Sequence, residues 1–188
     1  MRDDDDPKPW FPLTTERLNL RELREADFDD LHAYASDEEV VRFMDWGPNT
    51  PEQTRVVLDR WLAEQQAWPR AAVTLAIEKA ATGRVVGTIR LGLDERRPGV
   101  ADIGYCLHRD VWRQGYGTEA ARAVVAAAFG VIGLHRIEAN CDARNTGSWG
   151  IMEKLGMTRE GVLRQAHKRR DGWRDSYVYG LLTDEWTT

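Results

Sequence analysis

The sequence is poor in the residues that cross-link small proteins or hold metals. Its 188 residues include two cysteines, Cys106 and Cys141, and four histidines. Two cysteines so far apart form neither a disulfide framework nor a zinc ribbon, and the histidines lack a metal-ligand spacing such as His-Glu-x-x-His. We therefore expect two buried free thiols and no metal site.

Long apolar runs and a strong net charge are also missing. No apolar run approaches the roughly 20 residues that span a bilayer, and the acidic N-terminus is unlike the basic start of a signal peptide. The net charge is −5, and the run Asp3 to Asp6 supplies four of those charges. The nearly neutral remainder gives no electrostatic case for nucleic acid or a membrane surface as a partner. These absences predict a cytoplasmic protein.

What is present is an ordinary globular composition, with 42% hydrophobic and 30% charged residues. The length predicts one compact domain. We expect an acidic, proline-rich tail over residues 1–12 and a single domain over residues 13–188.

Periodicity and turn signals predict the elements of this domain. Thr50 before Pro51 is typical of a helix start, and Asp171 before Gly172 indicates a hairpin. The order predicts a mixed α/β protein in which one sheet is flanked by helices. The expected strands cover about 13–24, 73–77, 85–93, 101–107, 136–141, 162–167 and 173–182, and the expected helices about 27–35, 51–66, 118–129 and 145–155.

A glycine-rich turn, Arg113-Gln114-Gly115-Tyr116-Gly117, runs directly into the helix expected from Thr118. Free backbone N–H groups and the positive end of the helix dipole at such a position suit a phosphate or pyrophosphate. Glycine turns before helices are common, so this signal alone is weak. The rival nucleotide motifs fail, because there is neither a G-x-x-x-x-G-K-[ST] sequence nor a third glycine that would complete a dinucleotide fingerprint.

A second feature lies at the start of the helix expected over 145–155. Asn145 and Ser148 are three residues apart and project from the same side of its first turn. By itself Asn145 is explained by a capping role, and a place in a cofactor slot is the alternative.

Together these segments resemble the GNAT N-acetyltransferase superfamily, and within it the RimJ/RimL-like branch. The similarity spans about Leu13 to Leu182, and it implies a single, mostly antiparallel sheet of about seven strands with about four helices. Its motifs are Ile103-Gly104-Tyr105, Trp112 to Ala120, Asn145-Thr146-Gly147-Ser148 and Glu153 to Met157.

The resemblance implies acetyl-CoA as the cofactor. The main chain of Leu107 matches the position that pairs with the pantetheine arm, and Asn145 and Ser148 match residues that contact coenzyme A. Trp112 departs from the general motif at its first position. The residues expected to bind the pyrophosphate, through their backbone N–H groups, are Arg113, Gln114, Gly115, Tyr116, Gly117 and Thr118.

The resemblance also suggests catalytic residues. Many members use a tyrosine as the acid for the leaving thiolate, but Met152 stands there and cannot donate a proton. Ser148 matches the serine of the RimJ/RimL-like branch. His167 matches the position of a catalytic carboxylate and Asp102 is the next candidate base, with a water chain to main-chain carbonyls as the alternative.

Trp46, in the loop that borders the acceptor site in this family, and Tyr105 are candidate substrate contacts. The implied function is transfer of an acetyl group by direct attack in a ternary complex. The acceptor is a primary amine, either a protein N-terminus or a small molecule. A non-catalytic acyl-CoA sensor is the alternative, and a homodimer is possible.

Overall fold

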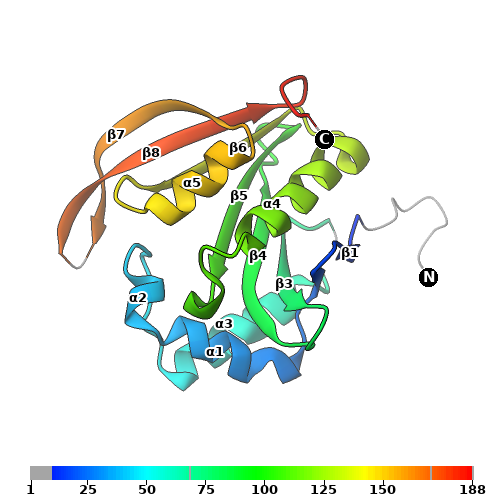
Figure 1. Ribbon diagram of the computed structural model, residues 1–188, viewed down its shortest axis with the longest axis vertical. Coiled ribbons are helices and arrows are strands. Elements are labelled where there is room, and N and C mark those ends of the chain that lie inside the picture. Colours follow the sequence, from blue (N-terminus) through cyan, green and yellow to red (C-terminus); the bar gives the residue numbers. More distant parts are fainter. Residues whose placement is uncertain (1–9, 68, 170, 188) are drawn as a thin grey trace.

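The computed structural model describes residues 10–67, 69–169 and 171–187. An eight-stranded sheet runs through the molecule in the order β1-β2-β3-β4-β5-β6-β8-β7 (Figure 1). The strands are β1 (Leu13–Thr14), β2 (Leu18–Glu22), β3 (Ala72–Lys79), β4 (Val85–Leu93), β5 (Val100–Leu107), β6 (Arg136–Asp142), β7 (Thr158–Arg169) and β8 (Gly172–Leu182). The α-helices within these residues are α1 (Phe28–Ala35), α2 (Glu38–Val41), α3 (Pro51–Glu64), α4 (Tyr116–Ala127) and α5 (Thr146–Lys154).

The mixed α/β prediction is confirmed, with one strand and one helix more than expected. The strand predicted over 13–24 is instead a tight hairpin in which β1 turns back on β2, with Leu13 opposite Leu20. The additional helix, α2, is a single turn that begins after Asp37, whose side chain accepts the N–H of Glu39. A helix this short leaves almost no periodicity to detect.

Helices cover both faces of the sheet. In Figure 1, α4 and α5 lie in front of the sheet, while α1 and α3 lie against its lower part. Leu75 and Ile77 of β3 point into the core cluster that also contains Ala120 and Val124 of α4. Ala76, between them, belongs to the second cluster with Leu31 and Leu58 of α1 and α3. The alternation of one strand therefore supplies both cores.

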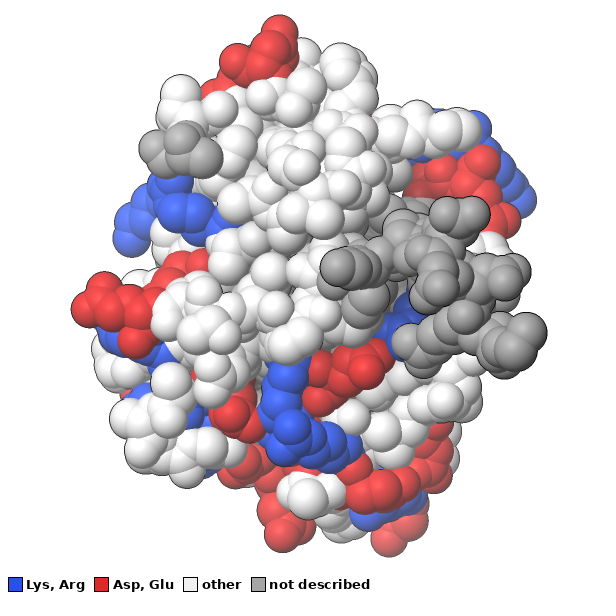
Figure 2. All heavy atoms as spheres, turned by 90° about the vertical axis from the view of Figure 1, so that its right-hand side faces the viewer, with Lys and Arg blue, Asp and Glu red and all other residues white. Residues whose placement is uncertain are grey.

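Of the predicted tail, residues 1–9 lie outside the described residues, whereas Trp10 and Phe11 pack against the main core. Figure 2 shows acidic and basic side chains interspersed on the face it presents, without a large patch of one sign. None of the described helices has the length and apolar character needed to cross a membrane.

The sheet changes character between β5 and β6, which are its parallel pair. Their register runs from Val100 opposite Arg136 to Asp102 opposite Glu138 and then stops. β5 continues to Leu107 and β6 to Asp142, and within the described residues neither has a partner on this side beyond that point. The two strands separate there, and each presents unpaired backbone groups to this split between β5 and β6.

Candidate active site

A groove of about 430 Å³ lies beside the end of β5, between the N-terminal ends of α4 and α5. Its lining includes Leu107, the turn residues Arg113 and Gly115, and Gly117 and Thr118 at the start of α4. On the other side it is lined by the first turn of α5, from Asn145 through Gly147 and Ser148 to Gly150.

The turn before α4 is built from left-handed backbone. Gly115, the residue before the helix, has a φ of 84°, and Arg113 has a φ of 59°. Glycine adopts this conformation without strain, whereas a non-glycine residue there costs about 1 kcal/mol or more. Strain of this kind persists where the surrounding structure holds the backbone in place. This turn places the backbone N–H groups at the start of α4 beside the groove.

Gly117 allows α4 and α5 to approach each other at this point. A Cβ at Gly117 would lie 2.7 Å from Cδ1 of Ile151 on α5 and 3.2 Å from Cδ1 of Leu107. Glycine at this position therefore sets the width of the groove, because any side chain would push the two helices apart or move Ile151.

Gln114 and Tyr116, whose backbone N–H groups were predicted to bind the pyrophosphate, are not among the residues that line the groove. Nε2 of Gln114 donates to the carbonyl oxygen of Asp110 at 2.6 Å. The Tyr116 ring packs under the guanidinium of Arg17, 4.2 Å from its centroid. Both side chains are therefore engaged away from the groove.

Leu107, at the end of β5, turns its N–H toward the unpaired side of the strand. His108 donates its N–H to the carbonyl oxygen of Val86 on β4 at 2.8 Å. Bonded and non-bonded pairs alternate along an antiparallel ladder, so the N–H groups of Tyr105 and Leu107 face away from β4. The carbonyl of Leu107 accepts the indole N–H of Trp112 at 2.9 Å. The Leu107 N–H therefore faces the split between β5 and β6.

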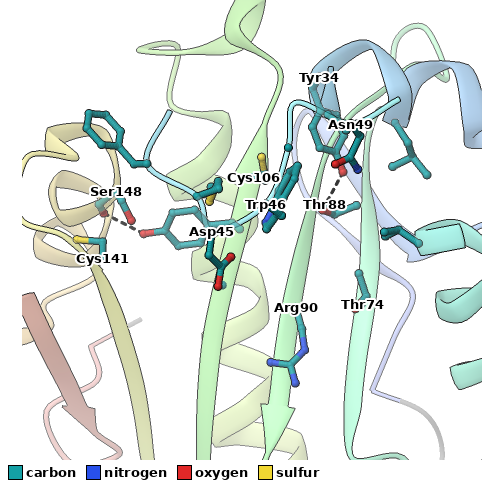
Figure 3. A pocket seen from close by; sticks show the side chains of 18 of the residues that line it. Tyr34, Asp45, Trp46, Asn49, Thr74, Thr88, Arg90, Cys106, Cys141 and Ser148 are labelled. Carbon is teal, nitrogen blue, oxygen red and sulfur yellow. Dashed lines mark hydrogen bonds between the residues drawn. The ribbon is translucent and has the colours of Figure 1, made fainter. Parts of the chain in front are cut away.

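The first turn of α5 is fixed by two hydrogen bonds. Oδ1 of Asn145 accepts the N–H of Ser148 at 3.1 Å, so Asn145 caps the helix as one reading of the sequence predicted. The hydroxyl of Tyr105 donates to the carbonyl oxygen of Ser148 at 2.9 Å (Figure 3). β5 and α5 are thereby joined across the split beside the Ser148 hydroxyl.

A second cavity, of about 920 Å³, lies on the α1 and α3 side of the sheet. Its roof is the loop that carries Met44, Asp45 and Trp46, and His167 of β7 also lines it. Figure 3 shows Asp45 and Trp46 reaching from this loop over the sheet. Both cavities are lined by Phe43, Met44, Tyr105, Cys106, Asn145 and Ser148.

The candidate bases occupy different places. His167 lines the larger cavity, but Asp102 does not. Oδ2 of Asp102 instead accepts Nη1 of Arg90 at 2.8 Å. Another carboxylate, Asp142, was not predicted from the sequence and is buried at the cavity wall. Burial alone raises its pKa, but the hydrogen bonds from the Arg144 side chain and N–H lower it overall. Asp142 is therefore a structural anion.

Met152 lines the larger cavity and is 2% exposed. Its thioether gives this wall an apolar surface and no proton donor. Among the described residues, no group of three or more histidine, cysteine or acidic side chains is placed to hold a metal ion.

The cavity floor contains further residues that the sequence analysis missed: Thr74, Thr88 and Arg90. They are polar residues on one face of two largely buried strands. A polar side chain in an otherwise apolar strand was the signal that would have found them.

Residues 17–158 match the family model of the acetyltransferase (GNAT) domain. The chain belongs to the GNAT acetyltransferase family. Among curated relatives, the uncharacterized N-acetyltransferase p20 of Bacillus licheniformis is 33% identical over 175 residues, covering 93% of this chain and 97% of that protein. The uncharacterized N-acetyltransferase YnaD of Bacillus subtilis is 29% identical over 174 residues, covering 93% and 98%.

Solved structures agree with this GNAT assignment. A GNAT-family acetyltransferase from Bacillus anthracis superposes with a TM-score of 0.80 at 28% identity, over 92% of this chain and 98% of that one. Mycobacterium smegmatis RimJ, solved in complex with CoA-disulfide, has a TM-score of 0.80 at 21% identity, over 95% and 91%, and shares the fold. The predicted resemblance to the GNAT superfamily is confirmed, and this GNAT protein is an acetyltransferase.

Proposed function

We propose that this enzyme transfers the acetyl group of acetyl-CoA to a primary amine by direct attack in a ternary complex. The observation that carries the proposal is the meeting of the two cavities at Tyr105, Ser148 and Asn145. A cofactor in the smaller groove and an amine in the larger cavity come together there. Holding both reactants in place removes several kcal/mol from the barrier of an intermolecular reaction.

The smaller groove fits coenzyme A in shape and chemistry. The N–H groups at the start of α4 suit the pyrophosphate, and Arg113 and Lys154 add positive charge to the lining. A Cβ on Gly150 would meet nothing within 4 Å, so this wall leaves room for the pantetheine arm. When bound, acetyl-CoA supplies an acetyl group activated as a thioester.

Ser148 and the main chain of Leu107 act on charge that develops at the junction. The N–H of Leu107, turned toward the split, polarises a carbonyl placed there, and the Ser148 hydroxyl donates a hydrogen bond to the leaving sulfur. The hydrogen bond between Tyr105 and the Ser148 carbonyl holds the turn that carries this hydroxyl.

His167 is the proposed base. An alkylamine with a pKa near 10 is almost wholly protonated at neutral pH and has no free electron pair. Imidazole accepts such a proton directly or through water. His167 lines the acceptor cavity, whereas the carboxylate of Asp102 is engaged by Arg90. The geometry thus favours His167 of the two candidates.

Neither cysteine suits a covalent acetyl-enzyme. Burial raises the pKa of Cys106 to about 12. Burial also raises the pKa of Cys141 to about 11, against the smaller opposing effects of the Ser148 hydroxyl and the Trp149 N–H. Because the thiolate is the nucleophile, both groups are inert at neutral pH. This supports direct transfer.

A thiol-release screen tests the proposal. Acetyl-CoA is incubated with the enzyme and with peptide α-amines, amino acids, polyamines or aminoglycosides. His167→Gln is compared with His135→Gln, a histidine that does not line either cavity. We expect His167→Gln to lose turnover with every amine that the wild type accepts, and His135→Gln to retain it. Coenzyme A binding without thiol release for any amine identifies a sensor instead.

A further inference from the structure

The floor of the larger cavity has a polar subsite to which the acetyl transfer assigns no role. Thr74 on β3 is the register partner of Arg90 on β4. Both line the cavity, and Figure 3 shows them on neighbouring strands. Thr88, two residues before Arg90, lies on the same face of the sheet.

Thr74 is the first observation that points to a ligand. The residue is 8% exposed, and its hydroxyl has no hydrogen-bond partner within the described part of the chain. By contrast, the Thr88 hydroxyl is 3.1 Å from the hydroxyl of Tyr34. A buried polar group without a partner costs about 1–3 kcal/mol. A ligand oxygen at the cavity floor removes that cost once the Thr74 hydroxyl turns toward it.

Arg90 is the second observation. Its Nη1 donates to Asp102, and both side chains are about half exposed, at 46% and 57%. Such a pair contributes little net stability, but it holds the guanidinium over Gly92, where a Cβ would lie 2.5 Å from Nη1. A guanidinium has five N–H donors, so one bond to Asp102 leaves donors for an anion in the cavity.

The path from this subsite to the junction of the cavities is open. Arg90 is opposite Gly104 on β5, and a Cβ on Gly104 would meet nothing within 4 Å. Two strand spacings, about 10 Å, separate β5 from β3. One short molecule can therefore place an amine beside Tyr105 and an oxygen-bearing group at Arg90.

We propose that Arg90 and Thr74 bind a carboxylate of the acceptor, so the enzyme acetylates amines that also carry a carboxylate. The inference rests on the proposed function. Arginine pairs with carboxylates through two parallel hydrogen bonds, and the threonine hydroxyl donates a third. The cavity has no acidic excess to attract a polyamine, because three basic residues balance three acidic ones among those lining it: Arg60, Arg90, Arg169, Asp45, Glu52 and Asp142.

The test compares acceptors that differ in one charge. Thiol release from acetyl-CoA is measured with glycylglycine and with glycylglycinamide, and also with the amides of aspartylglycine and asparaginylglycine. In each pair we expect the acceptor with the additional carboxylate to have a kcat/KM at least about tenfold higher than that of its uncharged partner, mainly through a lower KM. A preference in the first pair identifies a C-terminal carboxylate, and a preference in the second identifies an acidic side chain.

Variants assign the preference to the subsite. Arg90→Met removes the preference, mainly by raising KM for the acceptor that carries the carboxylate, whereas Arg90→Lys restores part of the preference. Thr74→Val weakens it by about threefold. Arg55→Met is the matched control, because Arg55 pairs with Glu25 outside both cavities. Melting temperatures check that each variant is folded.

Equal rates for acid and amide in the wild type overturn the proposal, as does a preference that survives in Arg90→Met. If no amine releases thiol, the same pairs are titrated with coenzyme A present by tryptophan fluorescence, since Trp46 and Trp61 line the cavity. Tighter binding of the acid, lost in Arg90→Met, supports the subsite, and equal binding refutes it. Failure of the proposed function shows instead as absent thiol release for every amine.

Discussion

Replacing Glu119 with alanine tests how the glycine-rich turn is held in place. Oε1 of Glu119 accepts the Thr15 hydroxyl at 2.6 Å and the Arg17 N–H at 3.0 Å. Oε2 accepts Nε of Arg17 at 2.7 Å, and Nη1 of Arg17 donates to the carbonyl oxygen of Gln114 at 3.0 Å. One carboxylate therefore ties the first hairpin of the chain to the turn that lines the proposed cofactor groove.

The expected loss follows from these contacts. The Glu119 side chain is 18% exposed, and Arg17 is 39% exposed. The hydrogen bonds from the Thr15 hydroxyl and from the Arg17 backbone N–H each contribute about 1 kcal/mol to the free energy of unfolding. The partly exposed Arg17 guanidinium contributes about 0.5 kcal/mol after solvent screening. Glu119→Ala should lower the free energy of unfolding by about 2–3 kcal/mol, or the melting temperature by roughly 5–10 °C. We also expect weaker binding of coenzyme A, because the turn loses its support.

The loss of stability caused by Glu119→Ala should depend on pH. Burial alone raises the pKa of Glu119, but the hydrogen bonds from Thr15 and Arg17 outweigh it, so the pKa is lowered overall from 4.5. A carboxylate with a lowered folded pKa stabilises the protein fully above its unfolded pKa, and that stabilisation is lost as the pH falls through the folded value. The difference between wild type and Glu119→Ala should therefore be complete at pH 7 and shrink under acid conditions.

Urea unfolding at several pH values measures both effects. Glu64→Ala is the control, because Glu64 is 49% exposed and lies 3.7 Å from Arg60 one helical turn away. Its loss should stay below about 0.5 kcal/mol. The reasoning is wrong if Glu119→Ala costs no more than Glu64→Ala, or if its cost is the same in acid as at pH 7.

Three further variants test the site itself. Ser148→Ala should lower kcat by about tenfold to a hundredfold while leaving coenzyme A binding within about twofold; an unchanged kcat in single-turnover assays contradicts its role. Cys106→Ala and Cys141→Ala should each keep most activity, and a burst of acetylated protein that either substitution abolishes refutes direct transfer. Gly150→Phe should weaken coenzyme A binding in calorimetry at least about tenfold without lowering the melting temperature, because its side chain enters the groove and glycine is a poor helix former; unchanged affinity places the cofactor elsewhere.

Local signals in the sequence predicted much of the fold. The apolar run bounded by turns placed a strand over 85–93, and β4 is Val85–Leu93. Thr50 before Pro51 placed the start of α3, where Thr50 indeed accepts the N–H of Gln53. The hairpin of β1 and β2 was missed because only three residues separate two short strands, so their pattern reads as one strand.

The site was less predictable because its geometry depends on contacts distant in the sequence. The sequence motifs placed Leu107, Gly115 and Ser148, which line one groove. Asp102 was a candidate base by its position in the chain, but strand register brings it to Arg90, twelve residues earlier. Register is set by pairing between strands, which the pattern within a single strand does not specify. At the floor of the larger cavity, the sequence shows polar residues that interrupt apolar strands, but only the register shows that Thr74 lies opposite Arg90.

The most direct test of the account is a crystal structure of the enzyme grown with coenzyme A. We expect the pyrophosphate within hydrogen-bond distance of the N–H groups between Gly115 and Gly117, the pantetheine arm along the end of β5, and the sulfur beside Ser148 at the junction of the two cavities. Coenzyme A bound at another surface, or a sulfur directed away from Ser148, would contradict it.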